Sequence, residues 1–283
     1  MTRRALPVAA LLAAVLPAGG CGAPPADPVR ERLAQIADPR AAEVVAMMFA
    51  AYGGHPAWTG HRSASYIQRL EFYGGEKTPR KISRQSHRFS LDPPVRLHLE
   101  DLEGETPQVV REDGDLLEVL RGGVPVTDPG LLEFPRFFGR LARDAFMQPW
   151  NLLAPGADLA IRSARTPPAA GRVPAGPCDV VRLSHENPDG TPGSDWSDFY
   201  VSRLSHLVDR VHTFRAEDGA YRVTLWSDHR MVEDVRIATR RATYSSDVTG
   251  AIGPLEVVVE YAGLGFDGPV FDGTPLAATP TAR

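Results

Sequence analysis

Residues 195–237 read DWSDFYVSRLSHLVDRVHTFRAEDGAYRVTLWSDHRMVEDVRI, and their alternation of apolar and polar side chains predicts four consecutive strands. We expect these strands at 196–202, 206–214, 220–226 and 231–237. The polar segments between them, 203–205, 216–219 and 227–230, have the length of hairpin loops. This pattern predicts an antiparallel meander, and something must cover its buried face.

The remaining chain extends this sheet in both directions. Alternation predicts about five strands between residues 63 and 120, and further strands at 158–163, 178–185, 240–247 and 255–261. A helix is expected over 38–52, with Asp38 as its N-cap and Gly53 after its end, and a second helix over 135–153. We therefore expect a mainly β protein: a single curved antiparallel sheet of about 10–11 strands, an incomplete β-barrel, with an N-terminal helix and an inserted helical lid.

The N-terminus has the features of an export signal. Arg3 and Arg4 precede an apolar run, and small residues then lead to Cys21. The stretch Leu16-Pro-Ala-Gly-Gly-Cys21 resembles a bacterial lipoprotein signal, in which the cysteine receives acyl chains such as palmitate; an ordinary cleaved signal is the alternative. We expect a signal peptide at 1–20, a lipidated tether and the start of a helix at 21–37, a folded domain at 38–273 and a disordered tail at 274–283.

Two further segments carry a resemblance to a known family. Val232-Glu-Asp-Val-Arg-Ile-Ala-Thr-Arg240 and Phe199-Tyr-Val-Ser-Arg-Leu-Ser-His-Leu207, together with the order of the predicted elements, resemble the Lol-type lipoprotein carrier and receptor superfamily. The sequence departs from that pattern at Ser202, Asp234 and Ala238. The resemblance implies a half-barrel wrapped over helices, with an apolar cavity that takes acyl chains and with no catalytic residues.

Large apolar side chains exceed what the predicted helices need for cover, which favours a ligand cavity. The expected ligand-binding residues are Phe137, Phe138, Phe146, Trp150, Phe199, Phe214, Tyr221, Leu225 and Trp226. The expected function is therefore binding of a lipid or an acylated protein. The alternatives are a ligand-free structural or protein-interaction module of the cell envelope and, less favoured, a hydrolase. No cofactor is implied.

Catalytic and metal motifs are weak in this sequence. Ser184-His185-Glu186 lacks the His-Glu-x-x-His spacing, and a strand would point its neighbouring side chains to opposite faces. Two groups of polar residues could meet across the central hairpins: Asp195, Asp198 and His206, and His212 with Asp228 or His229. We interpret both as solvated strand residues that are neighbours by chance. Cys178 is expected to be a buried structural thiol. We predict neither an enzyme nor a metal site.

The remaining expectations concern location and assembly. The chain has no long block of like charge, which argues against a nucleic-acid partner. Acylated Cys21 would anchor the protein to a membrane on its periplasmic face. Gly22 is not the aspartate associated with inner-membrane retention, which favours the outer membrane. We expect a monomer.

Overall fold

The computed structural model describes residues 28–154, 156–167, 169–174, 176–186 and 192–271. The predicted signal peptide, Cys21 and the predicted tail at 274–283 lie outside these residues, so they stay predictions. Within the described ranges, no helix has both the length and the apolar character needed to cross a membrane.

One antiparallel sheet contains all the named strands, in the order β6-β5-β4-β3-β2-β1-β13-β12-β11-β10-β9-β8-β7. The strands are β1 (Ser63–Phe72), β2 (Lys81–Ser90), β3 (Arg96–Asp101), β4 (Gln108–Asp113), β5 (Leu116–Arg121), β6 (Val124–Pro125), β7 (Ala157–Arg165), β8 (Cys178–Glu186), β9 (Pro192–Ser202), β10 (Val208–Arg215), β11 (Ala220–Val232), β12 (Val235–Ser246) and β13 (Ile252–Phe266). Because β1 pairs with β13, the chain begins mid-sheet, runs to the β6 edge, crosses to the β7 edge and returns. The predicted fold class is confirmed.

The helices gather at the start of the domain and at the crossing between the two edges. They are α1 (Pro28–Ala34), α2 (Pro39–Ala51), α3 (His55–Gly60), the 3-10 turn η1 (Pro129–Leu131), α4 (Glu133–Phe146) and the 3-10 turn η2 (Trp150–Leu153). Helix α2 begins as predicted, since the Asp38 carboxylate accepts hydrogen bonds from the backbone N–H groups of Arg40 and Ala41. The inserted helix is shorter than predicted: α4 ends at Phe146, and η2 follows Pro149, which has no N–H to donate.

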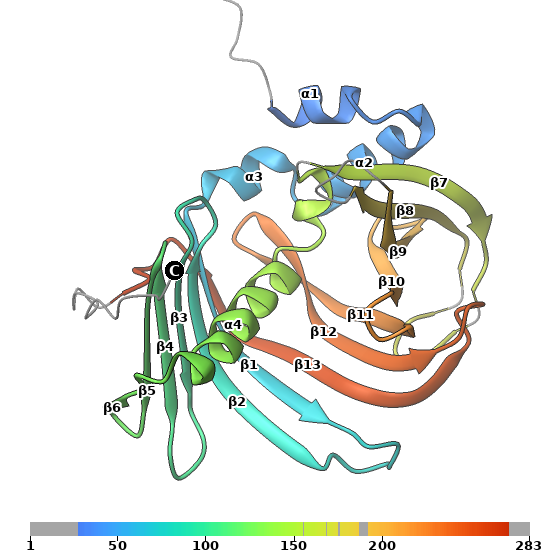
Figure 1. Cartoon of the computed structure of the whole chain (residues 1–283). Coiled ribbons are helices and arrows are strands. Elements are labelled where there is room, and N and C mark those ends of the chain that lie inside the picture. The colour runs from blue at the N-terminus through green and yellow to red at the C-terminus, as the bar shows by residue number, and fades with distance from the viewer. Residues whose placement is uncertain (1–27, 155, 168, 175, 187–191, 272–283) are drawn as a thin grey trace, which may run out of the picture.

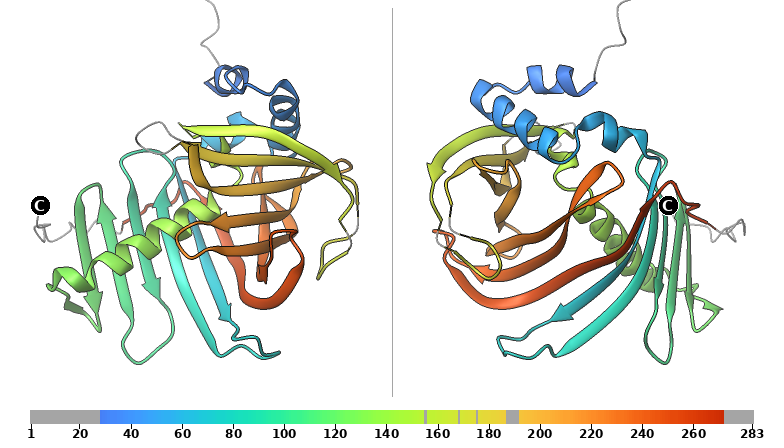
Figure 2. Two further views of the ribbon diagram at one scale, coloured as in Figure 1. Left: turned by 45° about the vertical axis from the view of Figure 1, so that its right-hand side comes forward. Right: turned by 180° about the vertical axis from the view of Figure 1, so that it is seen from behind.

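The sheet is strongly curved. Figures 1 and 2 show α4 lying diagonally across the β1–β4 half, while α1 and α2 lie near the β7 border and α3 leads from α2 towards β1. The crossing from β6 to β7 therefore runs along α4 and η2, over the face of the sheet instead of around its rim. We call the face that these helices cover the helix face.

The central meander differs from its prediction in one place. The expected loop at 227–230 lies inside β11, which pairs with β12 in unbroken register from Tyr221 opposite Ser246 to Val232 opposite Val235. The turn instead falls at Glu233 and Asp234. The strands predicted at 231–237 and 240–247 are instead parts of the two long strands β11 and β12. Within the described ranges the sheet has 13 strands, compared with the predicted count of about 10–11.

A large aromatic core fills the space between the helix face and the helices. Trp150 stacks between Phe49 of α2, with ring centroids 5.1 Å apart, and Trp58 of α3, at 5.3 Å. Further along the sheet, Tyr66 of β1 stacks on Phe146 of α4 at 4.7 Å. All five rings are buried, so this face is packed by the protein's own side chains.

Helix α4 is held close to the sheet by one glycine and one buried carboxylate. A Cβ on Gly139 would lie 2.2 Å from a methyl carbon of Leu97, so any other residue here would force the buried Leu97 side chain to move. Glu112 of β4 is fully buried beneath the helix and pairs with Arg140 and, at 3.6 Å, with Arg136. Three large apolar side chains of the same helix, Phe134, Phe137 and Leu141, are exposed to solvent.

Candidate functional site

The opposite face of the meander carries a second, mixed set of side chains. Alternation along neighbouring strands places Tyr200 of β9, Arg210 of β10 and Leu225 of β11 side by side, since Arg210 pairs with both of the others. Tyr244 of β12 lies on the same face, opposite Val223, which is two residues from Leu225 on β11. Arg210 is only 6% exposed, although arginine is charged and is rarely buried. This face therefore buries a guanidinium group among aromatic and aliphatic neighbours.

Residues 169–174, which we call the strap, cover part of this face. Ala170 and Val173 exchange backbone hydrogen bonds of 2.9 Å, which closes the strap into a tight turn. Val173 is buried against Val223 and Leu225, and this contact pins the turn to the sheet. Gly171 has φ +56°, and a Cβ there would lie 3.3 Å from Leu225. We call the covered side of the sheet the strap face.

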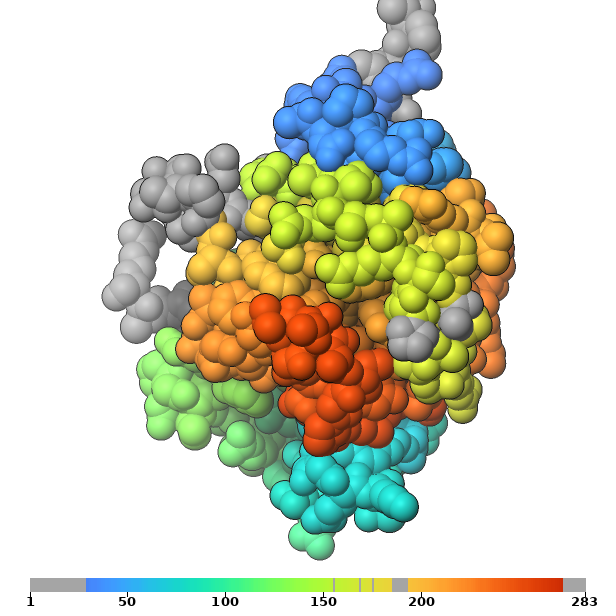
Figure 3. Space-filling view, turned by 90° about the vertical axis from the view of Figure 1, so that its right-hand side faces the viewer, coloured from blue at the N-terminus to red at the C-terminus, as the bar shows by residue number. Residues whose placement is uncertain are grey.

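A pocket of about 680 Å³ lies between the strap face, the strap and the tip of the β12–β13 hairpin. Figure 3 looks onto this side of the molecule, where the hairpin tip lies beside the segment that follows β7. Residues 249–252 form the hairpin wall, and the Asp247 carboxylate shapes it by accepting hydrogen bonds from the backbone N–H groups of Thr249 and Ala251. We call this the strap pocket, and its volume is in the range of small-molecule sites.

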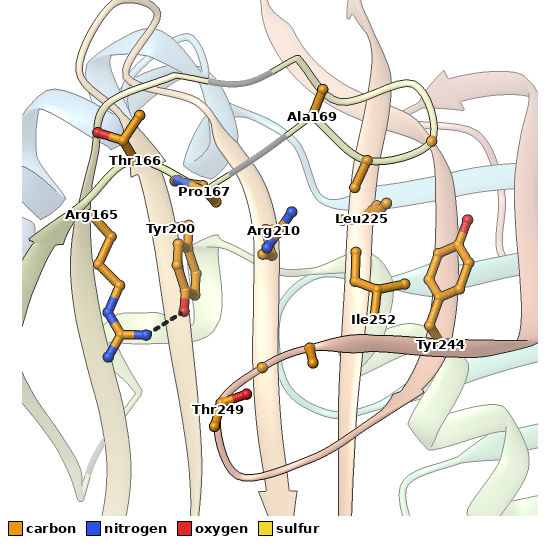
Figure 4. A pocket seen from close by; sticks show the side chains of 14 residues that line it. Arg165, Thr166, Pro167, Ala169, Tyr200, Arg210, Leu225, Tyr244, Thr249 and Ile252 are labelled. Carbon is orange, nitrogen blue, oxygen red and sulfur yellow. Dashed lines mark hydrogen bonds between the residues drawn. The ribbon is translucent and has the colours of Figure 1, made fainter.

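The lining of the strap pocket is divided by polarity. Figure 4 shows Arg165, Tyr200 and Arg210 towards one side and Leu225, Ile252 and Tyr244 towards the other. Arg165 lies 3.5 Å from the Tyr200 hydroxyl, to which it donates. Burial lowers the pKa of Arg210, yet a guanidinium stays charged at any physiological pH. Among the described residues that line the pocket there are two arginines and no Asp or Glu.

A smaller groove of about 240 Å³ lies between α4 and the β1–β4 half of the sheet. Its apolar lining includes Phe72, Leu99 and Phe138, and its charged lining includes both Lys81 and Asp101. This groove thus has charges of both signs at its border, whereas the strap pocket has only positive ones.

The structure separates the nine residues predicted to bind a ligand. Leu225 lines the strap pocket. Phe214 and Tyr221 form a pair on the same face, four residues along the strands from the Arg210–Leu225 pair, and their ring centroids are 4.8 Å apart. The members of the helix-face core are Phe146, Trp150, Phe199 and Trp226. Phe138 lines the groove under α4, and Phe137 is 62% exposed. The nine therefore do not form one site.

The strap pocket also contains residues that the sequence prediction did not include. They are Arg165, Tyr200, Arg210, Tyr244 and Ile252. Two signals pointed to them: Arg210 interrupts the apolar residues of a predicted strand, and the proline- and glycine-rich connection 164–177 is long for a link between paired strands. A long ordered connection of this kind commonly covers a functional surface.

The polar groups considered for catalysis have structural partners. Asp198 is held by Arg182 through two hydrogen bonds of 2.6 and 2.8 Å, and Asp195 is bound by Arg215 at 3.0 Å. The His212 ring contacts the backbone carbonyl of Asp247 at 3.0 Å. Within the described ranges, no group of three or more His, Cys, Asp or Glu side chains is arranged to hold a metal ion.

Two further titratable groups are buried away from the strap pocket's main lining. Cys178 is buried as predicted, and burial raises the pKa of its thiol to about 11. His61, at the end of α3, lies 2.8 Å from Asp267 through Nδ1 and 2.8 Å from Asp234 through Nε2. We call these three residues the His61 clip, because they join α3, the β11–β12 turn and the end of β13.

Comparison with known proteins finds likeness in fold alone. No protein-family model and no curated protein sequence matches the chain. A DUF1329 family protein from Desulfovibrio piger is similar in structure, with a TM-score of 0.48, 11% identity, and coverage of 88% of this chain and 96% of that one. So are an outer membrane lipoprotein-sorting protein domain from Vibrio parahaemolyticus (TM-score 0.47, 7% identity, 81% and 93% covered) and a LolA superfamily protein from Nitrosomonas europaea (TM-score 0.47, 8% identity, 78% and 93% covered). At these TM-scores and identities, no residue role is transferred from the three structures to this chain.

Proposed function

We propose that this protein is an exported bacterial lipoprotein that binds one amphiphile, a lipid or the acyl chain of a lipidated protein, in the strap pocket. The observation that carries the proposal is the divided lining of that pocket, cationic at one side and apolar at the other. An amphiphile satisfies both sides at once, because its chain removes apolar surface from water while its head remains near polar groups.

The helix face is an unfavourable alternative for the ligand. Its aromatic side chains are already in contact with one another, and entry of a chain there would have to displace packed rings such as Trp150 and Phe146. In the strap pocket, Ile252 is 37% exposed and offers apolar surface that a ligand can cover. Each methylene group buried there would contribute about 0.8 kcal/mol to binding.

The location that we propose is the cell envelope, with the protein held on the periplasmic side of the outer membrane by acyl chains on Cys21. The sequence from residue 1 to Cys21 supports this proposal. Stable anchoring of this kind requires more than one acyl chain. In this arrangement α1, which begins at Pro28, follows the lipidated residue after a short tether.

Displacement of a fluorescent fatty acid tests the binding proposal. The chain starting at Gly22 retains every described residue and is compared with two variants, Ile252→Glu in the pocket wall and Ile82→Glu on β2, where the side chain is 45% exposed. We expect Ile252→Glu to weaken binding by at least about tenfold, since a carboxylate would enter the apolar side, and Ile82→Glu to bind like the unchanged protein.

Two results would count against the proposal. If the unchanged protein takes up no fatty acid and no lipid co-purifies with it in native mass spectrometry, the ligand-free envelope module becomes the better account. If both variants lose binding equally, the fatty acid is not bound in the strap pocket.

A further inference from the structure

We infer that the amphiphile carries an oxyanion head, a carboxylate or a phosphate, which is bound between Arg165 and Arg210. This inference rests on the proposed function and adds the chemical class of the ligand. Arg210 lies in the wall of the pocket and is 6% exposed, whereas Arg165 is exposed at the end of β7. The two cations therefore lie at different depths on one side of the same pocket.

The first step of the argument is the sign of the charge. The two arginines are the charged residues among the described lining of the strap pocket. The Asp198 carboxylate accepts a hydrogen bond from Arg182, and the Asp228 carboxylate accepts one from Arg172 at 2.6 Å. Asp209, adjacent to Arg210 in sequence, does not line the strap pocket but lines a neighbouring cavity of about 50 Å³, whose wall shares Tyr200 and Arg210 with it. The Asp247 carboxylate, at the hairpin wall, accepts from the backbone N–H groups of Thr249 and Ala251. The charged side chains of the lining itself are therefore both positive, and they favour an anionic head over a neutral or cationic one.

The second step is geometry and burial. A planar guanidinium matches the two oxygens of a carboxylate or phosphate, and charge-assisted hydrogen bonds of this kind are stronger than neutral ones. Tyr200 adds a hydroxyl between the arginines, since it already contacts Arg165, and its ring lies 5.8 Å from the Arg210 guanidinium carbon. Because Arg210 is withdrawn from water, its attraction for an anion is screened less than that of an exposed cation.

The third step fixes the direction of the ligand. With its head at Arg165 and Arg210, the chain lies towards Leu225 and Ile252, on the other side of the pocket (Figure 4). Gly171 supports this path, because a side chain there would approach both Leu225 and the Tyr244 hydroxyl. The strap thus closes over the chain without filling the space that the chain needs.

A matched series of ligands tests the inference on the unchanged protein. Dodecanoate, dodecyl phosphate and dodecanol share one chain and differ in the head, and inorganic phosphate has the head alone. We expect the two anionic ligands to bind at least about tenfold more tightly than dodecanol, a difference of about 1.4 kcal/mol. Preference for one of the two identifies whether a carboxylate or a phosphate is the natural head. We expect inorganic phosphate to bind more weakly than either, because it lacks the chain.

An arginine variant and its control test the residues. Arg165→Gln removes a pocket cation, and Arg162→Gln removes an exposed cation from the same strand that does not line the pocket. We expect Arg165→Gln to reduce the advantage of the anions over dodecanol by at least about threefold, and Arg162→Gln to leave it unchanged. An advantage that survives in Arg165→Gln would overturn the assignment.

The failures of the two proposals can be told apart. Equal binding of dodecanoate, dodecyl phosphate and dodecanol would refute the oxyanion head while the proposed amphiphile function stands. Binding of none of the three would refute both.

Discussion

The His61 clip predicts a pH dependence of stability that can be isolated from other effects. A neutral imidazole has one N–H, whereas the protonated ring donates from both nitrogens, as two carboxylate oxygens at 2.8 Å require. Burial alone would lower the pKa of His61, but the hydrogen bonds that the ring donates to Asp267 and Asp234 outweigh burial and raise this pKa above its ordinary value. The charged clip therefore stabilises the folded state.

The sign follows from the direction of that shift. A group whose pKa is raised on folding contributes its full stabilisation below its unfolded-state pKa, which is 6.5 for histidine, and loses it as the pH rises through the folded-state pKa. The side chains of Asp234 and Asp267 are 61% and 50% exposed, so water screens both contacts. At about 0.5–1 kcal/mol for each contact, the clip contributes about 1–2 kcal/mol in mildly acidic solution.

Urea unfolding of the unchanged protein and of His61→Gln measures this contribution. We expect the free energies of unfolding to differ by about 1–2 kcal/mol near pH 5.5 and by clearly less near pH 9. The difference between the two proteins isolates His61, because two other histidines also titrate and are present in both. Burial lowers the pKa of His87 to about 3 and that of His229 to about 4. Those two rings are neutral in the folded state, so their contribution falls as the pH drops and opposes that of His61.

A second variant supplies the control. Asp234→Asn keeps the size of the side chain and removes one of the two charges from the clip. We expect it to show part of the same loss near pH 5.5. A difference between the unchanged protein and His61→Gln that stays constant, or grows, from acid to alkaline pH would refute the reasoning.

Three further outcomes are expected. Trp150→Ala should cost about 3–5 kcal/mol in urea unfolding, because its stacked indole is 7% exposed, and a loss below about 1 kcal/mol would contradict that packing. Phe137→Ser should change the same free energy by less than about 0.5 kcal/mol, because the ring is 62% exposed, and a larger loss would mean that the ring is covered in solution. Cys178, whose pKa burial raises to about 11, should react with iodoacetamide near pH 8 far more slowly in the folded protein than in urea; equal rates would contradict its burial.

Local patterns were sufficient to predict most of the fold. The alternation of apolar residues identified the strands because one face of each is buried, as at Phe199 and Val201 of β9. Helix α2 followed from Asp38 and Pro39 at its start, where the observed cap matches the expected one. These local patterns could not predict that β1 pairs with β13, since the paired residues are roughly 200 positions apart in the chain.

The error at 227–230 has a tertiary cause. Ser227-Asp-His-Arg230 is polar enough to predict a loop, but distant parts of the chain supply partners that keep it in a strand. Asp228 accepts from Arg172 of the strap, and its backbone carbonyl accepts from the Thr239 hydroxyl at 2.7 Å. The ring of His229 lies 3.3 Å from the hydroxyl of Tyr52, a residue just beyond α2.

The candidate site was harder to predict than the fold. Aromatic content predicted more apolar surface than two helices can cover, but it could not assign that surface to a face. The described part of the chain has four α-helices and two 3-10 turns, and its helix-face core includes Phe146 and Trp226. The strap pocket forms only when residues after β7 meet the β12–β13 hairpin, and no local pattern encodes that meeting.

The open order of the sheet gives it two edge strands, β6 and β7, to which a foreign strand could add. At one border β6 is only two residues long and includes Pro125, which has no N–H to offer. At the other, the backbone N–H of Ile161 in β7 donates to the Asp38 carboxylate at 2.8 Å, the same carboxylate that caps α2. The cap uses Oδ1 of Asp38 and Ile161 binds Oδ2, so an incoming chain that used this N–H would have to displace the residue that starts α2. The same side chain thus begins the helix and guards this border against polymerisation.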